Sequence, residues 1–108
     1  MDDQQFRQRA DEALNGLYRA LSDASDDYDF EVDFNAGALT IEFEEPPAKF
    51  VVSPNSPVKQ IWVSANVRSY KLDWDEAEQD FVISSTGQKL RSLMEDAISH
   101  HMGQEITL

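Results

Sequence analysis

The spacing of apolar residues changes twice along this chain of 108 residues. Over residues 6–21, apolar side chains recur every three or four positions, which places them on one face of a helix. Within residues 28–84, apolar and polar residues alternate instead in short stretches such as 28–34 and 39–43, as in strands that bury one face. Helical spacing returns over residues 90–101. These changes predict a helix, a run of strands and a second helix, in that order.

Local signals place the ends of these elements. The first helix is expected to start at a cap formed by Asp2 or Asp3 and to end between Ser22 and Ser25. Ser85 and Gln88 have the spacing of a capping box, which predicts that the second helix begins there. Six strands are predicted between the helices, at residues 28–34, 39–43, 50–52, 60–64, 70–74 and 81–84.

Short connections separate the predicted strands and favour an antiparallel meander. Residues 35–38 contain Gly37 and form the first turn, Pro46-Pro47 interrupts the chain, and a loop covers residues 53–57. Two amphipathic helices and one sheet with an apolar face predict an α+β two-layer sandwich, with two helices packed on about six antiparallel strands. At this length, residues 1–108 are expected to form a single domain.

The net charge of −12 excludes several classes of partner. Such a surface repels nucleic-acid phosphates and anionic lipid, and no apolar run approaches the roughly 18–20 residues of a membrane span. There are no cysteines, so no disulfide and no cluster or haem held by the chain's own thiolates is expected. The N-terminus has no signal-peptide pattern, and we expect a cytoplasmic protein, monomeric when metal-free.

The charge is concentrated near the N-terminus. Residues 1–45 carry a net charge of −10, and residues 46–108 carry only −2. We call residues 23–33 the acidic segment: it contains six acids and no base, namely Asp23, Asp26, Asp27, Asp29, Glu31 and Asp33. Three of these alternate along one predicted strand, about 7 Å apart. Such a row can share hard cations such as iron, calcium or manganese in shallow sites, or it can simply be a solvated strand face.

A second feature of the sequence is Trp62. Ile61 and Val63 are the inward pair of their predicted strand, so Trp62 shares the opposite face with Gln60 and Ser64. An aromatic side chain exposed on a polar sheet favours a contact site for a partner. The alternative is a strand covered on both faces.

The remaining candidates indicate no catalytic chemistry. His100 and His101 are adjacent on a predicted helix and point about 100° apart, so they cannot chelate one ion. No catalytic triad and no phosphate-binding glycine loop is present, and we expect no enzyme. A second acid-rich stretch at residues 73–80 is predicted to be a loop.

With its acidic segment and the strand that contains Trp62, the sequence resembles the frataxin family, and most closely its bacterial type. The similarity spans nearly the whole chain, in the same order and without large gaps. The matching pieces are Phe6, Ala10-Asp11, Asp29–Asp33, Gly37–Ile41, Pro57–Ser64, Tyr70–Asp73, Ser85–Gly87 and Gly103–Ile106.

The resemblance implies an iron-binding protein that regulates iron–sulfur cluster assembly and docks on the cysteine desulfurase and the scaffold protein. Family members bind iron along an acidic ridge formed by the first helix and the first strand. The resemblance therefore implies weak surface iron sites at Asp11, Asp23, Asp26, Asp27, Asp29, Glu31 and Asp33. It implies partner contacts at Asp23, Asp27, Asp29, Glu31, Asp33, Asn55, Gln60 and Trp62. Relatives often carry acids where this chain has Tyr18, Arg19, Ser22 and Ser25, so the helical part of the ridge is weaker here.

Three alternatives compete with this interpretation. An acidic mimic of nucleic acid, or a generic acidic interaction module that binds no iron, would also be strongly negative. A mimic would spread its charge over the whole surface, however, and would have no use for an exposed Trp62. A ferroxidase would need a clustered, buried ligand set, which the sequence does not indicate.

Overall fold

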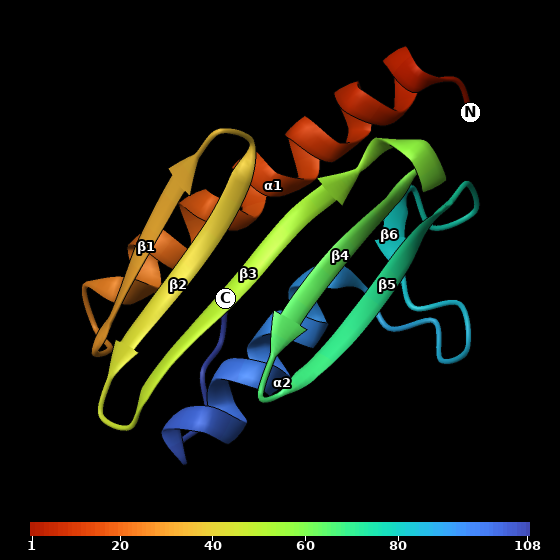
Figure 1. Ribbon diagram of the computed structural model, residues 1–108. Helices are drawn as coiled ribbons and strands as arrows, with labels where there is room; N and C mark the ends of the chain where they lie inside the picture. Colours follow the sequence, from red (N-terminus) through yellow and green to blue (C-terminus); the bar gives the residue numbers. More distant parts are fainter.

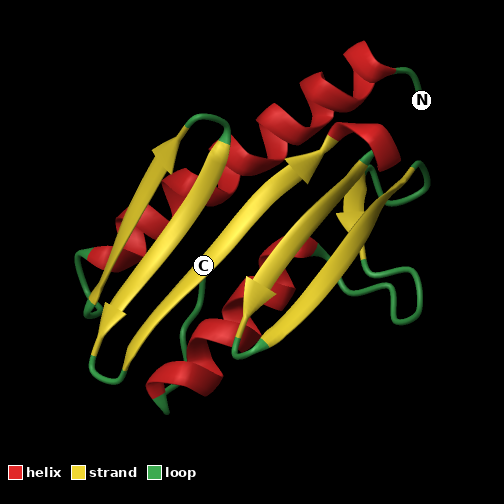
Figure 2. Cartoon of the chain, in the orientation of Figure 1, coloured by secondary structure: helices red, strands yellow, loops and turns green.

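The computed structural model describes residues 1–108 and has two layers. Figure 1 shows α1 (Asp3–Ser25) and α2 (Leu90–Met102) side by side behind a single sheet. The other face of the sheet carries no helix, as the colouring of Figure 2 makes plain. The predicted α+β sandwich is confirmed.

The sheet is a meander of six antiparallel strands in the order β1-β2-β3-β4-β5-β6. Each strand pairs with its neighbour in sequence, because short turns can join antiparallel strands. The strands are β1 (Phe30–Asn35), β2 (Ala38–Glu44), β3 (Pro47–Asn55), β4 (Gln60–Ala65), β5 (Arg68–Asp75) and β6 (Asp80–Val82), with a 3-10 turn at Ser56–Val58.

The core lies between the sheet and the helices. Alternate residues of the strands face inward, and the apolar stripes of both helices cover them in a cluster of 23 buried residues. Phe6 of α1 packs edge-on against Phe81 of β6 with ring centroids 6.0 Å apart. Ile106 in the C-terminal tail is 3% exposed, so the tail folds back onto the domain.

The start of α1 follows the sequence prediction. The Asp2 side chain accepts a hydrogen bond from the Gln5 backbone N–H at 2.8 Å, and the Gln5 side chain accepts one from the Asp2 backbone at 3.2 Å. This reciprocal pair satisfies two donors that a helix N-terminus otherwise leaves free.

The start predicted for α2 is wrong. The helix begins at Leu90 after Lys89, which makes no side-chain cap, and Ser85 and Gln88 do not form a capping box. Residues 83–87 instead form a turn in which the Gly87 N–H donates to the Ile83 carbonyl at 2.7 Å, with Gly87 at φ +76°. An isolated bridge between Val82 and Lys89 then keeps the chain extended up to the helix.

The third strand is longer than predicted at both ends. It runs from Pro47 to Asn55, although Pro46-Pro47 and the stretch 53–57 were expected to interrupt pairing. Ser53 lies opposite Trp62, and Pro54 lies opposite Ile61, in register with β4. Proline removes one backbone donor but remains compatible with extended backbone, so pairing with a neighbouring strand can include it.

Candidate metal and partner-binding surface

The acidic segment spans the junction between α1 and β1. Asp23 lies in the last turn of α1, Asp26 is the C-cap, and Glu31 and Asp33 point outward from β1. The strand starts at Phe30 rather than at residue 28, so Asp29 precedes it. The predicted row of three acids on one strand is therefore reduced to Glu31 and Asp33. The Asp27 and Tyr28 N–H groups still donate to the Ala24 carbonyl, and this turn delays the strand.

All six carboxylates of the acidic segment are exposed, and none has a partner in the fold. No hydrogen bond or ion pair joins any of their side chains to another group. No basic residue lies in the last turn of α1, where the helix dipole is negative and favours a cation. A positive partner at this end would therefore meet both the carboxylates and the negative end of the α1 dipole.

Two arginines lie near the acidic segment without pairing with it. Asp23 and Asp27 line a hollow of about 580 Å³ between α1 and the C-terminal segment, together with Arg19 and Arg91. None of the ion pairs in the structure includes these four side chains. The acidic segment thus keeps its negative charge even where bases lie close by.

The structure does not bring all seven predicted metal ligands together. Asp11 is exposed on α1 twelve residues before Asp23, about 18 Å away along the helix axis. No three His, Asp or Glu side chains converge in a way that could hold a metal ion. The arrangement suits shallow sites in which one or two carboxylates and water share an ion.

Sequence reasoning missed the acids of the neighbouring strand. Glu42 lies directly opposite Glu31 in the β1–β2 register, and Glu44 extends from the same outward face of β2. Their signal was present, because Glu42 lies between the inward residues Ile41 and Phe43. Like charges placed opposite each other destabilise a strand pair, so the second strand adds to the unpartnered negative charge.

Trp62 lies on the open face of the sheet, as predicted, and is 38% exposed. Its indole N–H donates to the Gln60 side-chain oxygen at 3.0 Å, and the Lys71 ammonium lies 5.1 Å from the ring centroid. Asn55 pairs with Gln60 across β3 and β4, so the structure gathers all three predicted sheet-face contact residues. Three strand spacings, about 14 Å, separate β4 from β1 and its acids.

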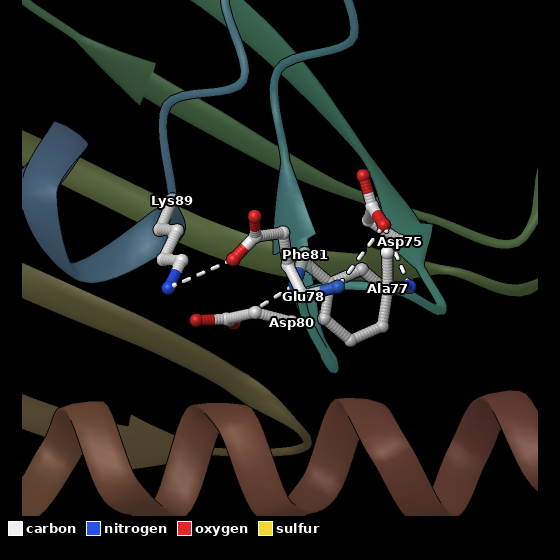
Figure 3. Close-up of polar contacts among 6 residues, drawn as sticks. All are labelled: Asp75, Ala77, Glu78, Asp80, Phe81 and Lys89. Atoms are coloured by element: carbon white, nitrogen blue, oxygen red, sulfur yellow. Dashed lines mark hydrogen bonds and ion pairs between the residues drawn. The ribbon is translucent and has the colours of Figure 1, made fainter.

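The second acid-rich stretch, which we call the acidic turn (residues 73–80), is not a simple loop. Asp73 and Asp75 belong to β5, Asp80 belongs to β6, and only residues 76–79 form the connection. Figure 3 shows the Asp75 carboxylate accepting hydrogen bonds from the backbone N–H groups of Ala77 and Glu78, at 2.9 and 3.1 Å.

The other carboxylates of the acidic turn also have partners. Glu78 pairs with Lys89 at 3.3 Å, and Asp80 accepts from the Phe81 N–H at 2.8 Å (Figure 3). Glu76 accepts from Gln79 at 3.2 Å, and Asp73 accepts from Gln60 and from Ser84. All five acids of this turn therefore have a role inside the fold.

The two histidines do not form a metal site. His101 packs on the Phe43 ring with centroids 4.4 Å apart, and its Nε2 atom lies 2.8 Å from the Pro46 carbonyl oxygen. His100 is exposed on the adjacent position of α2. No helix of the structure has the length and apolar character needed to cross a membrane.

Comparison with known proteins shows the family to which this chain belongs. A family model described as a frataxin-like domain matches residues 1–104, so the chain belongs to the frataxin-like family. A solved frataxin from Psychromonas ingrahamii superposes with a TM-score of 0.78 at 22% identity, covering 99% of this chain and 97% of that one.

Two curated relatives carry a more particular name, iron-sulfur cluster assembly protein CyaY. The one from Tolumonas auensis is 29% identical over 97 residues, which is 88% of this chain and 90% of the relative. The one from Azotobacter vinelandii is 27% identical over 100 residues, which is 91% of this chain and 90% of the relative.

Proposed function

We propose that this chain regulates iron–sulfur cluster assembly in the bacterial cytoplasm, without itself being an enzyme. It would bind iron weakly at the acidic segment and dock on the cysteine desulfurase and the scaffold protein. Membership of the frataxin-like family and the name that the two relatives share support the general role. The observation that carries the proposal is the set of six exposed carboxylates without a partner that runs from the negative end of α1 into β1.

Iron enters this proposal as cargo in shallow sites. Hard oxygen ligands suit ferrous and ferric ions, and water completes the shell where the protein supplies only one or two carboxylates. Asp23 and Asp27 are four residues apart and line one hollow, so they are the pair best placed to share an ion. Glu31 and Asp33 offer a second, more open place on β1.

A metal titration followed by NMR tests the iron sites. Ferrous ions added without oxygen, and calcium in a parallel series, should shift the amide signals of Asp23, Asp27, Asp29 and Glu31 before those of His100 and His101. The variant Asp23→Asn with Asp27→Asn should weaken these shifts, whereas Glu76→Gln with Glu105→Gln removes the same charge elsewhere and should preserve them. Shifts confined to the histidines would exclude the acidic segment as an iron site.

Docking would use two parts of the surface in different ways. The acidic segment would attract lysines and arginines of the desulfurase, and such rim charges mainly set the association rate and its salt dependence. Trp62, with Asn55 and Gln60 beside it, would contact the scaffold, and a central aromatic mainly sets the dissociation rate.

The variant Trp62→Ala separates these two parts. Because the side chain lies on the open face of the sheet, the variant should keep its circular dichroism spectrum. It should bind the desulfurase alone almost as the wild type does, but bind the complex containing the scaffold about 30-fold more weakly, as expected for a hot spot of about 2 kcal/mol. Wild-type affinity for that complex would remove Trp62 from the docking surface.

A further inference from the structure

A chain of three hydrogen bonds crosses the open face of the sheet and ends at Trp62. The indole Nε1–H of Trp62 donates to Gln60 Oε1 at 3.0 Å, and Gln60 Nε2 donates to Asp73 Oδ1 at 3.0 Å. Ser84, which follows β6, donates its hydroxyl to Asp73 Oδ2 at 2.8 Å. Gln60 and Asp73 are direct partners in the β4–β5 register, so the backbone pairing itself holds them together.

The chemistry of these groups allows only one direction for the chain. An ionised carboxylate can only accept hydrogen bonds, and an indole N–H can only donate. Gln60 has both a donor and an acceptor on its amide, so it must turn its nitrogen to Asp73 and its oxygen to Trp62. Asp73 therefore holds the Gln60 amide with its oxygen facing Trp62.

The indole is held in a second direction by its cross-strand partner. Trp62 lies opposite Lys71, whose ammonium is 5.1 Å from the ring centroid. The edge of the ring is thus fixed by Gln60 and one face is covered by a cation, while the side chain stays exposed. A side chain ordered before association loses less conformational entropy on binding.

We propose that Asp73, with Ser84 behind it, is a positioning residue that sets the orientation of Trp62 for docking. The docking step rests on the function proposed above, whereas the ordering of the indole does not. Asp73 would act through Gln60, without contacting the partner. This separates its role from that of the exposed acids at residues 23–33, which have no partner in the fold.

The indole N–H signal of Trp62 tests the ordering directly. The chain has two tryptophans, and Trp62→Phe assigns their signals. In Asp73→Ala, the Trp62 signal should move upfield and exchange with water about fivefold faster, because the Gln60 amide loses the hydrogen bond of ordinary strength that holds it toward Trp62. The Trp74 signal should not move. An unchanged Trp62 signal in a folded Asp73→Ala variant would overturn the proposal.

Two further variants control for the loss of charge and for a failure of Asp73→Ala to fold. Glu105→Ala removes the same charge from an exposed residue without side-chain partners, and it should leave the Trp62 signal in place. An equal shift in that control would mean that charge alone moves the signal, and would also overturn the proposal. Gln60→Leu removes both hydrogen bonds while keeping Asp73, and it should reproduce the faster exchange even if Asp73→Ala does not fold.

A double-mutant comparison links the ordering to docking. Asp73→Ala should raise the dissociation rate from the scaffold-containing complex about fivefold. In a Trp62→Phe background it should change that rate by less than about twofold, because phenylalanine has no N–H to position. Equal effects in both backgrounds would show that Asp73 touches the partner itself and would overturn the positioning role. If even Trp62→Ala docks normally, the proposed docking fails while the NMR result still decides the ordering.

Discussion

The acidic segment at residues 23–33 and the acidic turn at residues 73–80 have similar composition, with six and five carboxylates. In the turn, every carboxylate accepts a hydrogen bond or pairs with a lysine. In the segment, no carboxylate has a partner, and the nearest helix end is itself negative. Density of acids alone therefore does not identify a binding surface. The absence of internal partners is the better criterion, because unpartnered like charges cost stability that a bound external cation can restore.

The largest effect expected from this contrast is on association. Asp29→Lys with Glu31→Lys should weaken desulfurase binding at low salt by about 100-fold or more, since each reversal turns an attraction into a repulsion. Glu76→Lys with Glu105→Lys makes the same change of charge away from the segment and should have a much smaller effect. Surface plasmon resonance at two salt concentrations measures both. Equal losses for the two pairs would show that only the net charge matters, as a mimic of nucleic acid would require.

The second effect concerns stability, for which the acidic turn should matter more than the acidic segment. Asp75→Ala should lower the free energy of unfolding by about 1–2 kcal/mol, because the backbone N–H groups of Ala77 and Glu78 lose their acceptor. Asp26→Ala, at an exposed C-cap without side-chain bonds, should leave stability unchanged or raise it. Urea denaturation compares the two variants. A larger loss for Asp26→Ala would reverse the contrast between the two regions.

The third effect is a gain in stability. Asp27→Asn, Asp29→Asn and Asp33→Asn together should raise the free energy of unfolding of the metal-free protein by roughly 0.5–1 kcal/mol, by relieving repulsion among exposed carboxylates. Added salt should raise the melting temperature of the wild type more than that of this variant, since screening weakens the same repulsion. A melting temperature that is unchanged or lower would contradict the idea that the segment is a stability liability.

The smallest effect is expected at the Glu78–Lys89 ion pair. Both side chains are about half exposed, and Lys89→Met should change stability by less than about 0.5 kcal/mol. The turn should persist, because its backbone bonds to Asp75 and Asp80 remain. Thermal melts of this variant and of Asp75→Ala rank the two contributions. A loss as large as that of Asp75→Ala would assign the stability of the turn to its ion pair.

Much of the fold could be predicted because the signals are local. The period of apolar residues located both helices and all six strands, and the cap at Asp2 agrees with the sequence prediction. The errors lie where tertiary pairing competes with local signals. Prolines did not stop β3 because β4 offered a partner, and the turn at residues 83–87 overrode the capping pattern at Ser85 and Gln88.

The sequence by itself determined which residues face inward, where negative charge accumulates, and that Trp62 points away from the core. These properties follow from the period of single segments and need no knowledge of neighbours. Only the tertiary structure decided which acids have partners, that Glu42 lies opposite Glu31, and that Asp73 reaches Trp62 through Gln60. The last two relations depend on the register between strands, which pairs residues up to thirteen positions apart in the chain.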